Sequence, residues 1–194
     1  MAENTFELPS GYSQIEVIDF LGNRKQLLLV NGLCLLIAAV MVLAVPLFYG
    51  LQFTFSIDNL WGFLFKLLVF VAAVIVYMVL HELVHGVFIK IFSGQKAKYG
   101  FGFGYAYAGS DCYFNKKSYI IIALSPVIFW GAVLVVLNFL VPSGWFWVIY
   151  GVQIINISGA AGDYYVTHRM LHLPQDILVH DSGTKMLVYS KNCI

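Results

Sequence analysis

The stretch that decides the fold is LWGFLFKLLVFVAAVIVYMVLHELVHGVFIKIF, residues 60–92. A helix needs about 20 mostly apolar residues to cross a bilayer core of about 30 Å, and this run exceeds that length. Its only Lys, His or Glu residues are Lys66, Lys90 and those of the cluster His81-Glu82-Leu83-Val84-His85, and it contains no Arg or Asp. We therefore expect a membrane-spanning helix that carries titratable side chains.

The composition of the whole chain agrees with a membrane protein. Hydrophobic residues make up 60% of its 194 residues and charged residues 11%, against roughly 45–50% and about 25% in soluble domains. The length fits about one domain. The net charge is +1 and no basic run is interleaved with aromatic residues, which excludes a nucleic-acid partner. The expected partner is the lipid bilayer, and the composition does not define an oligomeric state.

Two further apolar stretches flank the first. Residues 26–49 are uncharged, and so are residues 118–162, a run long enough for two helices. Val141-Pro142-Ser143-Gly144 is typical of a turn and divides that run. We predict an all-α membrane protein with about four transmembrane helices.

The basic residues predict the orientation of these helices. Ten of the eleven Lys and Arg residues precede the first helix, lie between the second and third, or follow the fourth; Lys66 is the exception. Because Lys and Arg are retained in cytoplasmic loops, both termini should be cytoplasmic in a multi-pass protein of a bacterial plasma membrane. We expect a cytosolic segment over residues 1–25, a transmembrane catalytic domain over 26–172 and a cytosolic tail over 173–194.

Two segments have strand patterns. Residues 99–108 alternate large and small side chains, which predicts a strand-like, hairpin or re-entrant element against the helices. The alternative is a flexible aromatic loop at the membrane surface. Residues 176–189 predict a small cytosolic β-hairpin around the turn Asp181-Ser182-Gly183.

The chemistry centres on His81, Glu82 and His85. Histidines four residues apart on a helix share one face, so both imidazoles can reach one metal ion. In zinc hydrolases with this spacing the adjacent glutamate acts as the general base on water. Ionisable groups within a membrane are costly and usually functional. The alternative is a polar patch at the membrane interface.

A third ligand is needed, and Asp163 is the candidate. It lies near the end of the predicted fourth helix, at a depth similar to that of the histidines, after the small residues 158–162 that permit close helix approach. The alternative is a carboxylate merely exposed at the helix end. Asn156, seven residues earlier, would either donate a hydrogen bond to substrate or an oxyanion or form an ordinary interhelical hydrogen bond.

Three histidines remain. His168 and His172 follow the last predicted helix, next to Arg169, and fit a solvated surface helix, with one of them as an alternative metal ligand. His180 is expected to be a surface residue.

The motifs together resemble a known family. They are His81-Glu82-Leu83-Val84-His85-Gly86, the Gly/aromatic strand segment, Ala123-Leu124-Ser125-Pro126, and Asn156 followed by Gly162-Asp163. This set resembles the zincin peptidases of the DUF3267 type, which are similar to the site-2 protease group of intramembrane metalloproteases. The resemblance implies a three-helix core, with His81, His85 and Asp163 as zinc ligands and Glu82 as general base. The sequence lacks the Asn-Pro-Asp-Gly signature of site-2 proteases, since Gly162 and Tyr164 flank the aspartate.

The expected function is that of an intramembrane zinc metalloprotease. It would hydrolyse peptide bonds of membrane-associated protein or peptide substrates near the cytoplasmic face, with an unwound substrate segment pairing with the strand at residues 99–108. Zinc is expected, although the ligand types would also accept Fe, Co or Ni. The alternatives are a non-catalytic metal-binding protein that holds a partner, and ion transport, for which the first and third helices offer few polar residues.

Overall fold

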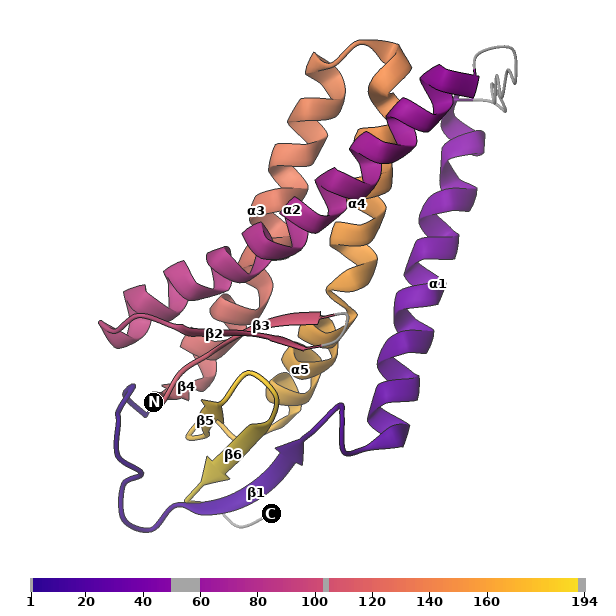
Figure 1. Cartoon of the computed structure of the whole chain (residues 1–194). Coiled ribbons are helices and arrows are strands. Elements are labelled where there is room, and N and C mark those ends of the chain that lie inside the picture. Colours follow the sequence, from indigo (N-terminus) through magenta and orange to yellow (C-terminus); the bar gives the residue numbers. More distant parts are fainter. Residues whose placement is uncertain (1, 50–59, 103–104, 192–194) are drawn as a thin grey trace.

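The chain folds into a bundle of helices that stands on a small β-sheet (Figure 1). The computed structural model describes residues 2–49, 60–102 and 105–191. The helices are α1 (Arg24–Tyr49), α2 (Leu60–Ser93), α3 (Lys116–Leu140), the short 3-10 helix η2 (Ser143–Trp145), α4 (Phe146–Gly159) and α5 (Ala161–His172).

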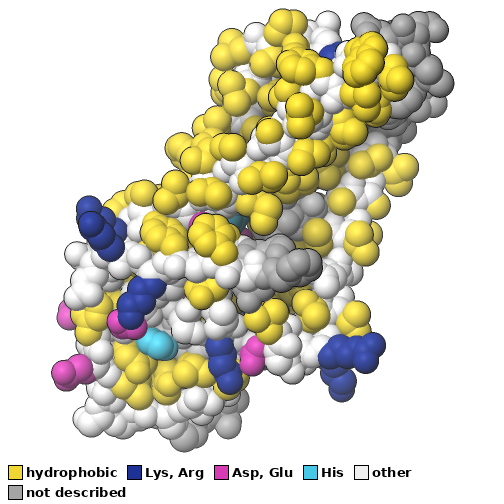
Figure 2. Space-filling view, in the orientation of Figure 1, with side chains coloured by type: hydrophobic (Ala, Val, Ile, Leu, Met, Phe, Trp, Pro, Cys, Tyr) yellow, Lys and Arg dark blue, Asp and Glu magenta, His cyan; other side chains and the backbone are white. Residues whose placement is uncertain are grey.

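Three of these helices are long and apolar enough to cross a membrane: α1 over Arg24–Ala44, α2 and α3. Many of their large apolar side chains face outward, with exposed fractions of 71% at Leu35 and 81% at Phe139. Figure 2 shows apolar side chains along the bundle and most charged groups near the sheet. A water-soluble protein rarely exposes so continuous an apolar surface, so the structure supports a membrane protein.

The predicted fourth span takes a different form. Its entrance is as expected, because α3 ends at Leu140 and η2 makes the turn into α4. However, α4 has 14 residues, a length of about 21 Å, which is shorter than a bilayer core. The run then breaks at Ala160, between Gly159 and Gly162, where low helix propensity disfavours a continuous helix. A four-span count is therefore not established.

The strands form two sheets, so the class is mostly helical and not all-α. A four-stranded antiparallel sheet has the order β1-β6-β5-β4, and β2 and β3 form a separate antiparallel pair. The strands are β1 (Ser13–Ile18), β2 (Lys98–Gly102), β3 (Tyr105–Gly109), β4 (Tyr113–Asn115), β5 (Leu178–Asp181) and β6 (Met186–Ser190).

The C-terminal strands are the inner strands of the larger sheet. β5 and β6 do pair, as the pattern of residues 176–189 predicts, but β1 from the N-terminal segment covers one side and β4 the other. The C-terminal segment therefore does not form a separate hairpin tail. The predicted N-terminal segment and tail instead pack together, and the domain boundaries given above stay a prediction.

The larger sheet shares a core with α2, α3 and α5. Phe114, Met170 and Val179 are buried there. At the end of α5, the Lys116 ammonium at the start of α3 donates to the carbonyls of Leu171 (3.2 Å) and Leu173 (2.8 Å), which otherwise lack helical partners. These contacts fix α3 and α5 relative to each other.

The β2-β3 hairpin packs against α2, in agreement with the strand prediction for residues 99–108. Tyr99 lies over Gly86, where a Cβ atom would collide with the phenol. At the same end of the pair, Gly109 in β3 lies against the backbone of Ser182. The hairpin is thereby held between α2 and the turn that joins β5 to β6.

Candidate metal centre

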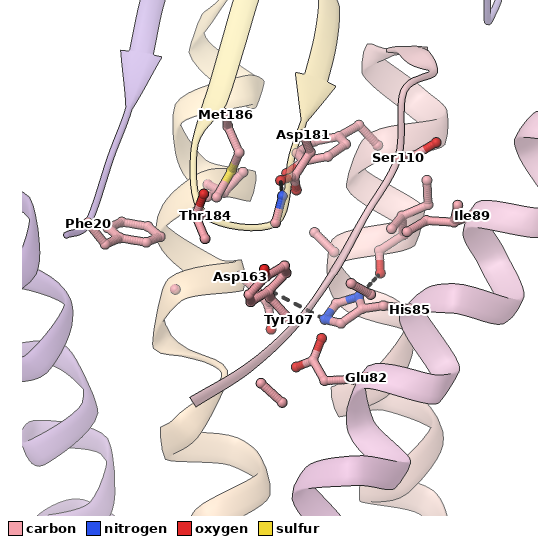
Figure 3. Close-up of a pocket in the computed structure, with 18 of the residues that line it drawn as sticks. Phe20, Glu82, His85, Ile89, Tyr107, Ser110, Asp163, Asp181, Thr184 and Met186 are labelled. Atoms are coloured by element: carbon pink, nitrogen blue, oxygen red, sulfur yellow. Dashed lines mark hydrogen bonds and ion pairs between the residues drawn. The ribbon is translucent and has the colours of Figure 1, made fainter. Parts of the chain in front are cut away.

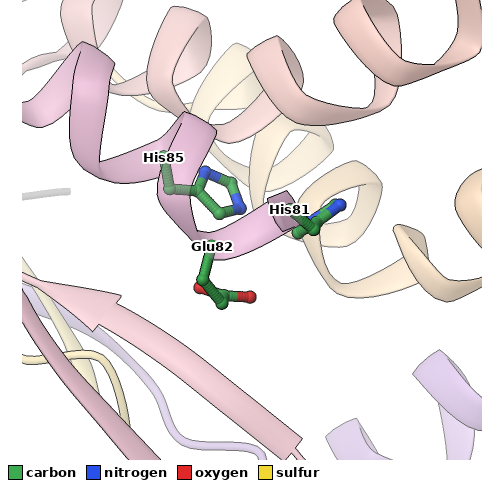
Figure 4. A group of neighbouring side chains, drawn as sticks. All are labelled: His81, Glu82 and His85. Carbon is green, nitrogen blue, oxygen red and sulfur yellow. The ribbon is translucent and has the colours of Figure 1, made fainter. Parts of the chain in front are cut away.

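The predicted cluster is assembled on one helix. The ligand-capable atoms of His81, Glu82 and His85 lie within 4.8 Å of one another, and no other such group of three is found among the described residues. In Figure 4 the two imidazoles extend to the same side of α2, and Glu82 extends away from that side. This arrangement follows from the four-residue spacing of the histidines.

Asp163 approaches both imidazoles from α5. Its Oδ2 atom lies 3.6 Å from His81 Nε2, and its Oδ1 atom lies 3.7 Å from His85 Nε2. Ligands placed tetrahedrally at about 2.0–2.1 Å from zinc would be about 3.3–3.4 Å apart. Asp163 belongs to the first turn of α5, directly after the break at Ala160. Because α5 begins at this break, Asp163 lies at the start of a helix, and its carboxylate faces the histidines.

A backbone carbonyl fixes the proton position on His85. Its Nδ1 atom lies 2.9 Å from the carbonyl oxygen of Ile122 in α3. A carbonyl oxygen can only accept, so Nδ1 carries the proton. The Nε2 atom therefore keeps its lone pair and faces Asp163.

A side-chain relay fixes His81 in the same way. The Asn156 amide nitrogen donates to the Val127 carbonyl (3.2 Å), which turns the amide oxygen toward Tyr77. The Tyr77 hydroxyl donates to that oxygen at 2.8 Å and lies 2.8 Å from His81 Nδ1. Because the hydroxyl has a single proton, it accepts from Nδ1. His81 Nε2 is thus also free to bind a metal.

The donor set fits zinc. Two imidazoles with their Nε2 atoms directed at one carboxylate are a usual set of zinc ligands, and hydrogen bonds on the opposite ring nitrogens are the usual support for such ligands. Two carboxylates lie near these imidazoles. The Asp163 oxygens are 3.6 and 3.7 Å from the two Nε2 atoms, and the ligand-capable atom of Glu82 lies within 4.8 Å of those of both histidines. The Glu82 carboxylate also has a hydrogen bond with the backbone of Ala108 in β3.

Asn156 lies away from the cavity. Its side chain is fully buried, and its amide bonds to Tyr77 and Val127. Of the two sequence alternatives, the structure shows the interhelical hydrogen bond. The seven-residue spacing from Asp163 does not put the two residues on one helix, because the run breaks at Ala160 and Asn156 belongs to α4 while Asp163 belongs to α5.

A cavity of about 450 Å³ opens beside the cluster. Figure 3 shows it between α2, α5 and the turn that joins β5 to β6, with the Glu82 carboxylate and the His85 ring at its wall. Apolar side chains form much of the remaining lining, among them Phe20, Ile89, Phe114, Ile122, Val166 and Met186. The cavity is therefore mostly apolar beside His85 and Glu82.

Asp181 is a cavity residue that the sequence analysis missed. It accepts hydrogen bonds from the Tyr119 hydroxyl (2.6 Å) and the Gly183 amide (2.7 Å). Burial raises the pKa of its carboxyl from 3.8 to about 6, against the lowering effect of these bonds, and Asp163 adds repulsion. In the sequence, Asp181 begins an Asp-Ser-Gly turn, and nothing there indicates that the turn reaches the site.

The remaining histidines lie elsewhere. His168 and His172 are exposed on α5, and His172 Nδ1 lies 2.8 Å from the His168 carbonyl. The His180 ring is half-buried against the ring of Tyr113, with 4.9 Å between the centroids. None of the three joins the cluster on α2.

The comparisons with known proteins point to one family. The family model DUF3267, described as "Putative zincin peptidase", matches residues 74–178, more than half of the chain. The matched region includes both histidines, Glu82 and Asp163. No curated protein and no solved structure matches the chain. The chain therefore belongs to the DUF3267 zincin peptidase family.

Proposed function

We propose that this protein is an intramembrane zinc metallopeptidase. The observation that carries the proposal is the pair of Nε2 atoms held toward Asp163 at 3.6 and 3.7 Å. This pair lies on a helix that is long and apolar enough to cross a membrane. The substrates would be membrane-associated proteins or peptides, cut near the end of the bundle that carries the sheet. That end is predicted to be cytoplasmic.

In this proposal His81, His85 and Asp163 hold zinc, and Glu82 acts as general base. Bound zinc would supply a Lewis acid that acidifies water and polarises a peptide carbonyl. Glu82 takes a proton from the attacking water and returns it to the leaving amine. It has access to both groups because its carboxylate lines the cavity.

The outer edge of β3 offers a place for the substrate backbone. The amide of Ser110 donates to the Asp181 carbonyl at 2.8 Å, and the backbone of Ala108 bonds to Glu82. Neither group points toward β2, and backbone groups alternate along a strand, so those of Ala106 also face away from β2. An unwound substrate segment that pairs with this edge would run past Glu82, which supports recognition by strand addition.

Glu82→Gln tests the catalytic role. The amide keeps the size of the side chain but cannot act as a base, so the variant should retain about one zinc per chain, as a three-ligand site predicts, and lose cleavage. The measurements are metal content by mass spectrometry and cleavage of a membrane-peptide substrate in detergent micelles. Asp163→Asn is the matched amide control, and it should weaken zinc binding instead.

The outcomes separate catalysis from metal binding. Wild-type protein that holds zinc and cleaves no membrane peptide would favour a non-catalytic metal-binding protein. Cleavage by Glu82→Gln at the wild-type rate would remove Glu82 from the mechanism.

A further inference from the structure

Pro126 interrupts the hydrogen bonding of α3 next to the metal centre. It lies within the helix, where a proline has no N–H group to donate to the carbonyl four residues earlier. That carbonyl belongs to Ile122. It is therefore the one carbonyl in this turn of α3 that proline leaves without its usual backbone partner.

The freed carbonyl is the one that binds His85. The Ile122 oxygen lies 2.9 Å from His85 Nδ1 and also accepts from the Ser125 hydroxyl at 2.9 Å. A carbonyl oxygen has two lone pairs, so these two donors fill it. An ordinary residue at position 126 would add a third donor in direct competition with the imidazole.

We propose that Pro126 is a positioning residue that reserves the Ile122 carbonyl for His85. It would thereby hold the His85 ring in the Nδ1–H form, with Nε2 facing Asp163. The inference rests on the metal centre of the proposed function, and it assigns a role to the Ala123-Leu124-Ser125-Pro126 motif. A purely structural alternative exists, because membrane helices tolerate proline when a serine or a neighbouring helix satisfies the freed carbonyl.

Pro126→Ala separates the two roles. The alanine N–H restores the helical bond to Ile122, so the metal-free fold should be as stable as wild type or more stable. Zinc affinity should nevertheless fall by about 10–100-fold, the usual effect of losing a partner of a histidine ligand. Zinc affinity is measured by competition with a chromogenic chelator in detergent, and stability by thermal unfolding of chelator-treated protein. Peptide cleavage is not a readout, so failure of the peptidase proposal does not affect this test.

Pro46→Ala is the matched control, because Pro46 belongs to the last turns of α1, a helix that carries none of the proposed metal ligands. It should leave zinc affinity unchanged. Unchanged affinity in Pro126→Ala would overturn the proposal, and so would a loss of affinity accompanied by a less stable metal-free fold.

A second measurement covers a variant that does not fold. Nitrogen-15 NMR of chelator-treated wild-type protein, with His85 assigned by comparison with His85→Gln, should show Nδ1 protonated. An Nε2–H tautomer at His85 would overturn the proposal without any change at Pro126.

Discussion

The two histidines of the metal centre are held by different kinds of acceptor. His85 bonds to a backbone carbonyl, whereas His81 bonds to the Tyr77 hydroxyl. Only the second partner can be removed by changing one side chain. Tyr77 is buried and packs edge-on against His81, with 5.7 Å between the ring centroids, so phenylalanine can keep its packing.

Tyr77→Phe should weaken zinc binding by about 10–100-fold, because the His81 Nδ1–H loses the acceptor that fixes its ring. Chelator competition in detergent measures the change. Tyr150→Phe is the matched control, since its hydroxyl donates to the Met41 carbonyl at 2.9 Å and to no metal ligand. Equal zinc affinity in both variants would show that the relay through Asn156 does not support His81.

At the scale of elements, one edge of β3 pairs with β2 and its other edge is turned toward the site. The alternation of large and small residues over 99–108 predicted the strands correctly. In the strand pair, Gly100 is opposite Tyr107, so the large Tyr107 side chain lies over a residue without a side chain. The sequence could not reveal which edge would be free. That depends on the docking of Tyr99 at Gly86 and of Gly109 at the turn after β5.

Ala106→Pro tests strand addition on this edge. A proline is tolerated where the strand N–H points away from its neighbour, so the fold and the zinc content should persist. Cleavage of membrane peptides should fall at least about tenfold, for two reasons. One backbone hydrogen bond to the substrate, worth about 1 kcal/mol, is lost. The proline ring also obstructs the edge sterically. Ala106→Ser keeps the N–H and should cleave normally. Wild-type cleavage by Ala106→Pro would refute strand addition.

At the scale of the whole molecule, the sheet is joined to the bundle beside the metal centre. The Asp181 carboxylate, at the end of β5, accepts a hydrogen bond from the Tyr119 hydroxyl in α3. The raised pKa of Asp181, about 6, means that the folded state favours its protonated form. Between pH about 4 and 6 the folded protein therefore binds more protons than the unfolded chain.

The free energy of unfolding of metal-free protein should consequently fall as the pH rises through this range. The contribution of Asp181 is about 1–3 kcal/mol, because each pKa unit corresponds to about 1.4 kcal/mol. Asp181→Asn cannot titrate, so its stability relative to wild type should improve from pH 4 to 6 and stay constant above that. Unfolding of chelator-treated proteins at several pH values measures this difference. A difference that is independent of pH would contradict the raised pKa of Asp181 in the folded state.

The sequence by itself determined the membrane character, the histidine pair with its glutamate, and the turn before α4. Each depends on local composition or on helical spacing, which act within a few residues. The break at Ala160 was less predictable, since a single apolar run concealed it, and it is this break that places Asp163 at the start of α5.

Only the tertiary structure decided how the centre is supported. Asn156 bonds to Tyr77, Ile122 presents its carbonyl to His85, and Asp181 reaches the cavity from the C-terminal strands. Ile122 is 37 residues from His85 in the sequence, and Asn156 is 79 residues from Tyr77. The physical reason is that a hydrogen bond depends on the distance and direction of two groups in space, which helix packing sets and sequence periodicity does not contain.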